Sequence, residues 1–153
     1  MQMTWPGAPT IYYGDEAGVC GFTDPDNRRT YPWGQEDLQM IEFHRAAIAM
    51  HRKYPVFIGG SILFLMGDYN CLAYARFDEC EKVIVVFNNN DHEKELTVPV
   101  WQADVENGKT LTRIFCTDEN GFSLDKAEVT VHCGEVQLQM PATSSSVLYR
   151  AEK

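Results

Sequence analysis

The residues best suited to chemistry lie in one loop, residues 15–33, which is dense in Gly, Asp, Pro and Arg. Its run Asp24-Pro25-Asp26-Asn27-Arg28-Arg29 places two carboxylates, an amide and two guanidinium groups within six residues. Carboxylates accept hydrogen bonds and guanidinium groups donate them in a fork, so the run is suited to the hydroxyls of a neutral polar ligand such as a sugar. The alternative is a turn in which the Asp and Arg side chains only pair with each other.

Asp15 and Glu16 come earlier in the loop, directly after Gly14. As a catalytic pair in a retaining glycosidase, their carboxyl groups would have to lie about 5–5.5 Å apart across the scissile bond. The side chains of adjacent residues normally diverge instead. We therefore expect both residues to shape the loop, with Asp15 accepting hydrogen bonds from the backbone.

The isolated His and Trp residues carry no site signature. His44 and His51 lie on the expected helix, where we expect packed or surface side chains. Trp5, Trp33 and Trp101 are too widely separated in the sequence to indicate a sugar-stacking platform, so we expect them in the core or in an interface.

A short strand must position the start of the loop. Residues 9–13 form an apolar run bounded by Pro and Gly14, which is typical of a strand buried on both faces in a parallel sheet. Asp15 and Glu16 would then follow its carboxyl end, the side on which barrels and open α/β sheets bind substrates. Such a strand needs neighbours on both sides, and no βα unit precedes it. The sequence therefore reads as the last part of an α/β domain.

One helix, expected over residues 35–53, follows the loop. Glu36 and Asp37 in its first turn and three basic residues in its last turn complement the helix dipole, and Pro55 follows its end. Two apolar stripes indicate that the helix is covered on two sides. The stripes are Leu38, Ile41, Arg45 and Ile48, and Met40, Phe43, Ala47 and Met50.

After residue 57 the apolar period changes to two, with turn residues between the runs. Short strands at this spacing predict an antiparallel sandwich or barrel. The expected strands are residues 61–66, 71–77, 82–87, 94–100, 109–116, 128–133, 136–140 and 146–149.

Length, charge and cysteine content limit the class of protein. The chain has 153 residues, too few for a complete (β/α)₈ barrel of about 250. Its formal net charge of −9, without a basic patch, argues against nucleic acid and against an anionic membrane surface. No apolar run approaches a membrane span of about 20 residues, and the start does not read as a signal peptide. Five cysteines without paired spacing favour a reducing cytoplasm and argue against a metal site.

Residues 6–33 resemble a known enzyme family. Residues 6–18 read PGAPTIYYGDEAG, which is similar to the eighth barrel strand of the alpha-amylase family of glycoside hydrolases, where the pattern is PG-x-P followed by IYYGDE-x-G. Residues 24–29, with Pro32-Trp33, resemble the next loop of the neopullulanase, cyclomaltodextrinase and maltogenic amylase branch. Beyond these motifs, residues 35–53 correspond to the eighth barrel helix and the strands to the domain that follows the barrel.

The resemblance implies a mainly β fold. It is an antiparallel β-sandwich preceded by the last strand, loop and helix of a TIM barrel. The expected division is residues 1–57 as barrel remnant and residues 58–153 as sandwich domain.

The resemblance also implies an activity. Family members cleave or rearrange α-1,4, and in some cases α-1,6, glucosidic bonds with retention, using an Asp nucleophile, a Glu acid/base and a second Asp. These three follow earlier barrel strands, and no position here matches them, so we expect no catalytic residue in this chain and no activity from it alone. Asp24 and Arg28 match the loop residues that contact glucose units on the non-reducing side of the cleavage point. No metal or other cofactor is implied.

Two further interpretations stay open. The chain could be a stand-alone carbohydrate-binding or structural β-sandwich in which residues 1–57 cover one sheet. It could also pair with a separately encoded barrel, or with itself, through the exposed barrel remnant. The expected ligand of the parent enzyme is a malto-oligosaccharide or a cyclodextrin.

Overall fold

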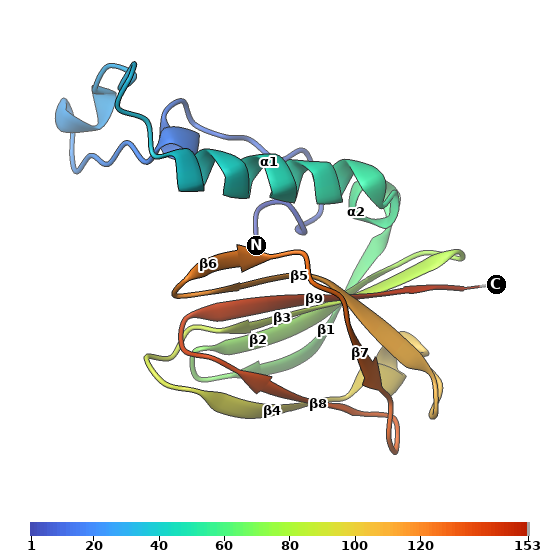
Figure 1. Cartoon of the computed structure of the whole chain (residues 1–153). Coiled ribbons are helices and arrows are strands. Elements are labelled where there is room, and N and C mark those ends of the chain that lie inside the picture. Colours follow the sequence, from blue (N-terminus) through green and yellow to red (C-terminus); the bar gives the residue numbers. More distant parts are fainter. Residues whose placement is uncertain (153) are drawn as a thin grey trace.

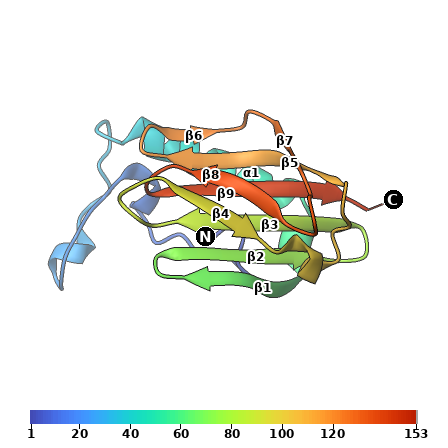
Figure 2. The same ribbon diagram turned by 90° about the horizontal axis from the view of Figure 1, so that it is seen from below.

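A helix, a large antiparallel sheet and a small two-stranded sheet are stacked in three layers (Figure 1). The structure is a computed structural model and describes residues 1–152. The first layer contains α1 (Leu38–Lys53), the short α2 (Val56–Gly59) and the segment that precedes α1. Seen from below, the two-stranded sheet lies across the opposite face of the large sheet (Figure 2).

All strand pairs within the described residues are antiparallel. The large sheet contains β1 (Ser61–Asp68), β2 (Cys71–Phe77), β3 (Glu81–Asn88), β5 (Thr110–Asp118), β6 (Gly121–Ser123), β7 (Ala127–Thr130) and β9 (Ser144–Ala151). Its order is β1-β2-β3-β9-β5-β6, and β7 pairs with the first part of β5. The small sheet contains β4 (Lys94–Val98) and β8 (Val136–Met140). The expected antiparallel sandwich is thus confirmed.

Three strand expectations need correction. β6 was not expected, because three residues are too few to show an alternating pattern. β4 ends at Val98, since Pro99 lacks the N–H that a sheet needs and a 3₁₀ turn, η3 (Val100–Ala103), follows. β7 ends at Thr130, before a turn in which Cys133 has a φ of 53°.

Both faces of the large sheet are covered by apolar side chains. Ile84 and Val86 of β3 belong to the core between the two sheets, whereas Val83 and Val85 belong to a second core beneath α1. All four side chains are fully buried. A strand covered on both faces is apolar throughout, which explains why β3 lacks the alternation seen elsewhere.

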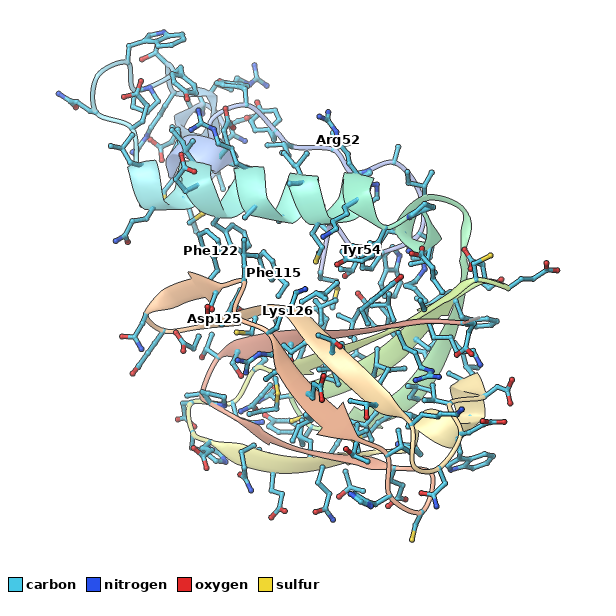
Figure 3. The ribbon with its side chains drawn as sticks, turned by 45° about the vertical axis from the view of Figure 1, so that its right-hand side comes forward. Arg52, Tyr54, Phe115, Phe122, Asp125 and Lys126 are labelled. Carbon is cyan, nitrogen blue, oxygen red and sulfur yellow. The ribbon has the colours of Figure 1, made fainter. Side chains whose placement is uncertain are left out.

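α1 packs on the sheet through one of its two expected stripes. Ala47 and Met50 are buried, and the Phe43 ring lies 6.0 Å from the rings of both Phe115 and Phe122, centre to centre. Figure 3 shows Phe115 and Phe122 beneath the helix. In the other stripe, Leu38 is 70% exposed.

None of the helices in residues 1–152 is long and apolar enough to cross a membrane.

The start of α1 differs from the expectation. Glu36 and Asp37 precede the first turn rather than forming it, and the Asp37 carboxylate accepts a hydrogen bond from the Met40 amide at 3.0 Å. This N-cap satisfies one of the free amide groups at the helix start, so the helix begins at Leu38.

The expected buried strand at residues 9–13 is wrong for this structure. Residues 9–12 have no regular secondary structure, and Tyr12 and Tyr13 are exposed. A parallel strand exists only through hydrogen bonds to its neighbours, and nothing in residues 1–152 pairs with this segment. It runs instead as an extended chain toward the loop (Figure 1).

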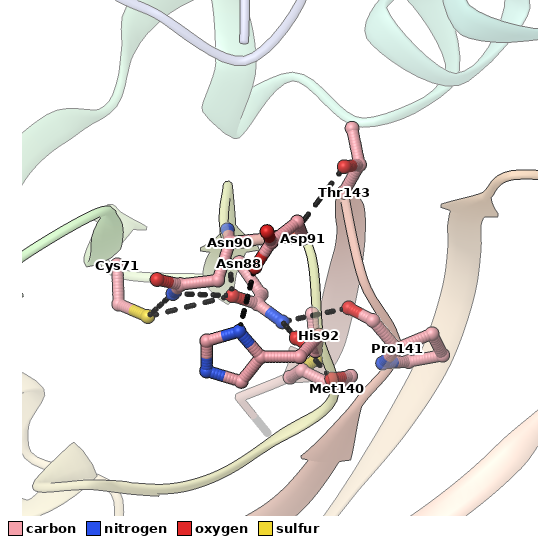
Figure 4. Close-up of polar contacts among 8 residues, drawn as sticks. All are labelled: Cys71, Asn88, Asn90, Asp91, His92, Met140, Pro141 and Thr143. Atoms are coloured by element: carbon pink, nitrogen blue, oxygen red, sulfur yellow. Dashed lines mark hydrogen bonds and ion pairs between the residues drawn. The ribbon is translucent and has the colours of Figure 1, made fainter.

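A buried polar cluster fastens the turn after β3 to the turn before β9 (Figure 4). Asn88 is 1% exposed, and its amide nitrogen donates to the carbonyl oxygens of His92, Met140 and Pro141 at 2.7–3.1 Å. Its amide oxygen accepts from both the backbone and the side chain of Asn90. Both polar atoms of the Asn88 side chain therefore form hydrogen bonds, and these bonds connect the end of β3 in the large sheet to the end of β8 in the small sheet.

Candidate functional site

The candidate site is the loop that rises from the N-terminal end of α1 (Figure 1). Its base is a 3₁₀ turn, η1 (Asp15–Ala17), flanked by Gly14 and Gly18, both with positive φ. A Cβ on Gly14 would lie 3.0 Å from the Val19 side chain, so glycine is required there. The Glu16 carboxylate, rather than that of Asp15, accepts the backbone N–H of Gly14 at 3.0 Å, which corrects the expectation for Asp15.

The middle of the loop is a second 3₁₀ turn, η2 (Asp26–Arg28). Two ion pairs lie beside this turn, and the first joins Asp26 and Arg29. Arg29 donates to Asp26 from two nitrogens at 2.7 and 2.9 Å, and the other Asp26 oxygen accepts the amide of Phe22 at 3.1 Å. The hydrogen bond from Arg29 lowers the pKa of Asp26 below its usual value. Asp26 and Arg29 therefore bond within the loop, and their side chains are 46% and 57% exposed, respectively.

The second ion pair joins Asp24 and Arg28 beside the same turn. Arg28 Nη2 donates to Asp24 Oδ2 at 3.0 Å, and the two side chains are 68% and 62% exposed, respectively. A forked donor and a carboxylate are thus presented together to solvent, an arrangement that suits the hydroxyl groups of a sugar. The structure brings these two predicted residues together, and the pairing of both Asp side chains with Arg side chains is also what the alternative of a simple turn expects.

Aromatic side chains border the same loop. The rings of Tyr31 and Trp33 lie 4.5 Å apart, centre to centre, and Trp33 is 82% exposed. Tyr13 donates a hydrogen bond to the Arg29 carbonyl at 3.0 Å, which ties the preceding segment to the loop. Trp5, Trp33 and Trp101 are all exposed, so none of them lies in the core, and the expectation of an interface stays a prediction. In the sequence, Tyr31 and Trp33 follow the charged run closely, and this closeness could have indicated that both rings belong to the candidate site.

His44 and His51 are half-buried on α1, in keeping with the expectation of packed or surface side chains. His44 Nδ1 lies 2.9 Å from the Met40 carbonyl oxygen, and His51 Nδ1 lies 2.8 Å from that of Met3. His51 also stacks on Phe57. In the part of the chain that the structure describes, no three His, Cys, Asp or Glu side chains are placed to hold a metal ion.

Comparison with curated proteins places this loop and the sandwich in one group of enzymes. The chain is 42% identical over 153 residues to an amylopullulanase from Thermoanaerobacter thermohydrosulfuricus, covering 97% of this chain and 10% of that protein. It is 34% identical over 103 residues to a cyclomaltodextrinase from Geobacillus thermopakistaniensis, covering 65% of this chain and 18% of that protein. The chain therefore spans less than a fifth of the length of these two relatives.

Solved structures show the same fold. An Anoxybacillus alpha-amylase superposes with a TM-score of 0.81 at 23% identity, covering 99% of this chain and 30% of that one. A debranching enzyme from Nostoc punctiforme superposes with a TM-score of 0.72 at 27% identity, covering 96% of this chain and 29% of that one.

A family profile gives the assignment. The profile described as "Alpha amylase, C-terminal all-beta domain" matches residues 65–151, which is more than half of the 153-residue chain. The chain belongs to the alpha-amylase family, and its sandwich is the C-terminal all-beta domain of that family.

Proposed function

We propose that this chain is the C-terminal part of a retaining α-glucan hydrolase or transglycosylase that acts on α-1,4 glucosidic bonds, with α-1,6 bonds as further substrates. Relatives named amylopullulanase and cyclomaltodextrinase support this proposal. The substrate would be a malto-oligosaccharide or a cyclodextrin. The nucleophile and the acid/base would lie in a part of the enzyme outside these residues, so the chain alone would be inactive.

The exposed Asp24–Arg28 pair is the observation that supports a substrate-binding role for particular residues of this chain. In our proposal, the two side chains bind glucose units on the non-reducing side of the cleavage point. Binding needs no new fold, because Asp24 and Arg28 are already accessible beside the turn. A sugar hydroxyl can replace the partner of either side chain at small cost, since exposed ion pairs are weak.

In the same proposal, residues 1–57 are the end of a (β/α)₈ barrel and residues 58–153 are the separate sandwich domain. The extended segment at residues 9–13 would become the eighth strand once neighbouring strands pair with it. The exposed Leu38 side chain of α1 would be covered by the rest of the barrel or by self-association. Five free cysteines are in keeping with our proposal of a cytoplasmic location.

The coding sequence upstream of residue 1 tests this proposal. We expect strand–helix repeats in the same reading frame, with Asp and Glu at the ends of strands. An upstream frame that encodes no such repeats would overturn it and favour a stand-alone sandwich. The titration of the purified chain with maltoheptaose would then ask whether it binds carbohydrate by itself.

A further inference from the structure

The joint between α1 and the sandwich is a helix too short to be stable by itself. α2 has four residues, whereas an isolated helix needs roughly 12–15 residues to be even marginally stable in water. Its first amide groups and last carbonyl groups also lack partners within the helix. The chain leaves α2 through Gly60, where a Cβ would lie 2.5 Å from the Val56 carbonyl oxygen. Groups outside α2 must therefore hold this tight joint in place.

Arg76 of β2 holds the C-terminal end of α2. Its guanidinium donates to the carbonyl oxygens of Phe57 at 3.2 Å and Gly60 at 2.7 Å, and also to that of Ser61 at 3.2 Å. The side chain is fully buried, and no carboxylate in residues 1–152 forms an ion pair with it. A buried cation is costly unless it is fully hydrogen-bonded, and here backbone carbonyls supply those bonds.

Glu81 of β3 holds the other end of α2. One oxygen of its carboxylate accepts the amide N–H of Val56 at 3.1 Å, and the other accepts the hydroxyl of Tyr149 at 3.0 Å. The Tyr149 ring in turn lies 4.5 Å from that of Tyr54, which is the residue at the C-terminal end of α1. The negative charge at the start of α2 and the positive charge at its end both match the direction of the helix dipole.

Arg76 also fastens the first residues of the chain to α1. It donates to the Thr4 carbonyl oxygen at 2.8 Å, and the Thr4 hydroxyl lies 2.6 Å from that of Tyr74. The neighbouring carbonyl, that of Met3, contacts Nδ1 of His51 on α1 at 2.8 Å. Hydrogen bonds of Arg76 therefore connect it to α1 in two ways, through α2 and through the N-terminal turn.

We propose that Arg76 and Glu81 are positioning residues that clamp α2 from both ends and so fix α1, with the loop that precedes it, on the sandwich. The effect on the loop matters for catalysis only if Asp24 and Arg28 bind substrate, so that part rests on the proposed function. The clamp itself does not. It acts on α1 through backbone carbonyl and amide groups rather than through a ligand.

Hydrogen exchange of the 153-residue chain, followed by mass spectrometry, tests the clamp. Arg76→Met removes the guanidinium donor from four carbonyl groups, and we expect exchange in α1 and α2 to rise on the order of tenfold or more. Amides of β5, β8 and β9 should keep their protection. Arg76→Lys should restore part of the protection, because it keeps the charge but not the fork. Arg113→Met on β5 is the matched control, since Arg113 bonds the Asp125 carbonyl rather than α2.

Glu81→Gln keeps the proposal testable if Arg76→Met does not fold. The amide keeps the size of the carboxylate and removes its charge, and we expect faster exchange in α2 and the last turn of α1. Equal loss of protection in α1 and in β5, β8 and β9, or no change in α1, would overturn the clamp. Either result stands whether or not the chain belongs to an α-glucan hydrolase, so it separates a failure of the clamp from a failure of the proposed function.

Discussion

Arg28 and Asp24 form an exposed ion pair of 3.0 Å beside a short turn, whereas Asp26, paired with Arg29, also accepts the backbone amide of Phe22. An exposed pair contributes only about 0–1 kcal/mol to stability. We therefore expect Asp24→Ala and Arg28→Ala each to change the free energy of unfolding by less than about 1 kcal/mol in urea titrations. A loss above about 2 kcal/mol would mean that the pair supports the fold and would remove it as a ligand site.

Asn88 should be far more important for stability. Asn88→Ala removes the side-chain donor to the carbonyl groups of His92, Met140 and Pro141 and the acceptor that Asn90 uses, so we expect a loss of about 2–4 kcal/mol in urea unfolding. The exposed neighbour provides the control, and Asn89→Ala should cost less than about 0.5 kcal/mol. Equal effects of the two substitutions would show that the cluster does not hold the turns.

Tyr149 should make the fold sensitive to alkaline pH. Burial, and then the hydrogen bond to Glu81, raise the pKa of Tyr149 from 10.0 to about 12. Its contribution to stability is complete below pH 10 and is lost as the pH rises toward 12, because the unfolded chain gives up the proton first. Unfolding titrations should therefore show a flatter decline for Tyr149→Phe than for the wild type over this pH range. A Tyr69→Phe control, on an exposed ring, should follow the wild type, and parallel curves for all three would refute the effect.

The Asp37 cap should stabilise the end of α1 that carries the loop. Asp37→Ala removes the acceptor for the Met40 amide, and we expect a loss of about 1 kcal/mol in thermal or urea unfolding. Glu36→Ala is the matched control, because Glu36 precedes the helix and does not cap it. If the two variants were equally stable, α1 would not depend on this cap.

The sandwich could be predicted from the sequence because its signals are local. The alternation in Val136, Leu138 and Met140 and the turn residues around it depend on neighbours along the chain, and β8 has the expected bounds. The prediction of a strand at residues 9–13 was wrong for the opposite reason. The apolar run matches a buried strand, but a parallel strand is stabilised by partners far away in sequence, and the described residues contain none.

The residue types of the candidate site could be predicted from the sequence, but the pairing of their side chains could not. The charged run marked Asp24 and Arg28, yet only the structure shows that Asp26 pairs with Arg29 and Asp24 with Arg28. Arg76 is the only charged residue of β2, whose other residues are apolar, but this pattern does not reveal its partners. Its role follows from four carbonyl groups, three of them in residues 57–61 and one in the N-terminal turn.

The central claim is tested most directly by the kcat/KM for maltoheptaose of the protein extended upstream in its own reading frame. We expect hydrolysis by the extended protein, none by the 153-residue chain, and a fall of about 10- to 100-fold for Arg28→Ala, the range that corresponds to losing hydrogen bonds from a charged group to substrate. Arg45→Ala, which breaks a similarly exposed pair with Glu42 on α1, should retain the wild-type value. An extended protein without activity on α-glucans, or an Arg28→Ala variant as active as the wild type, would contradict the account.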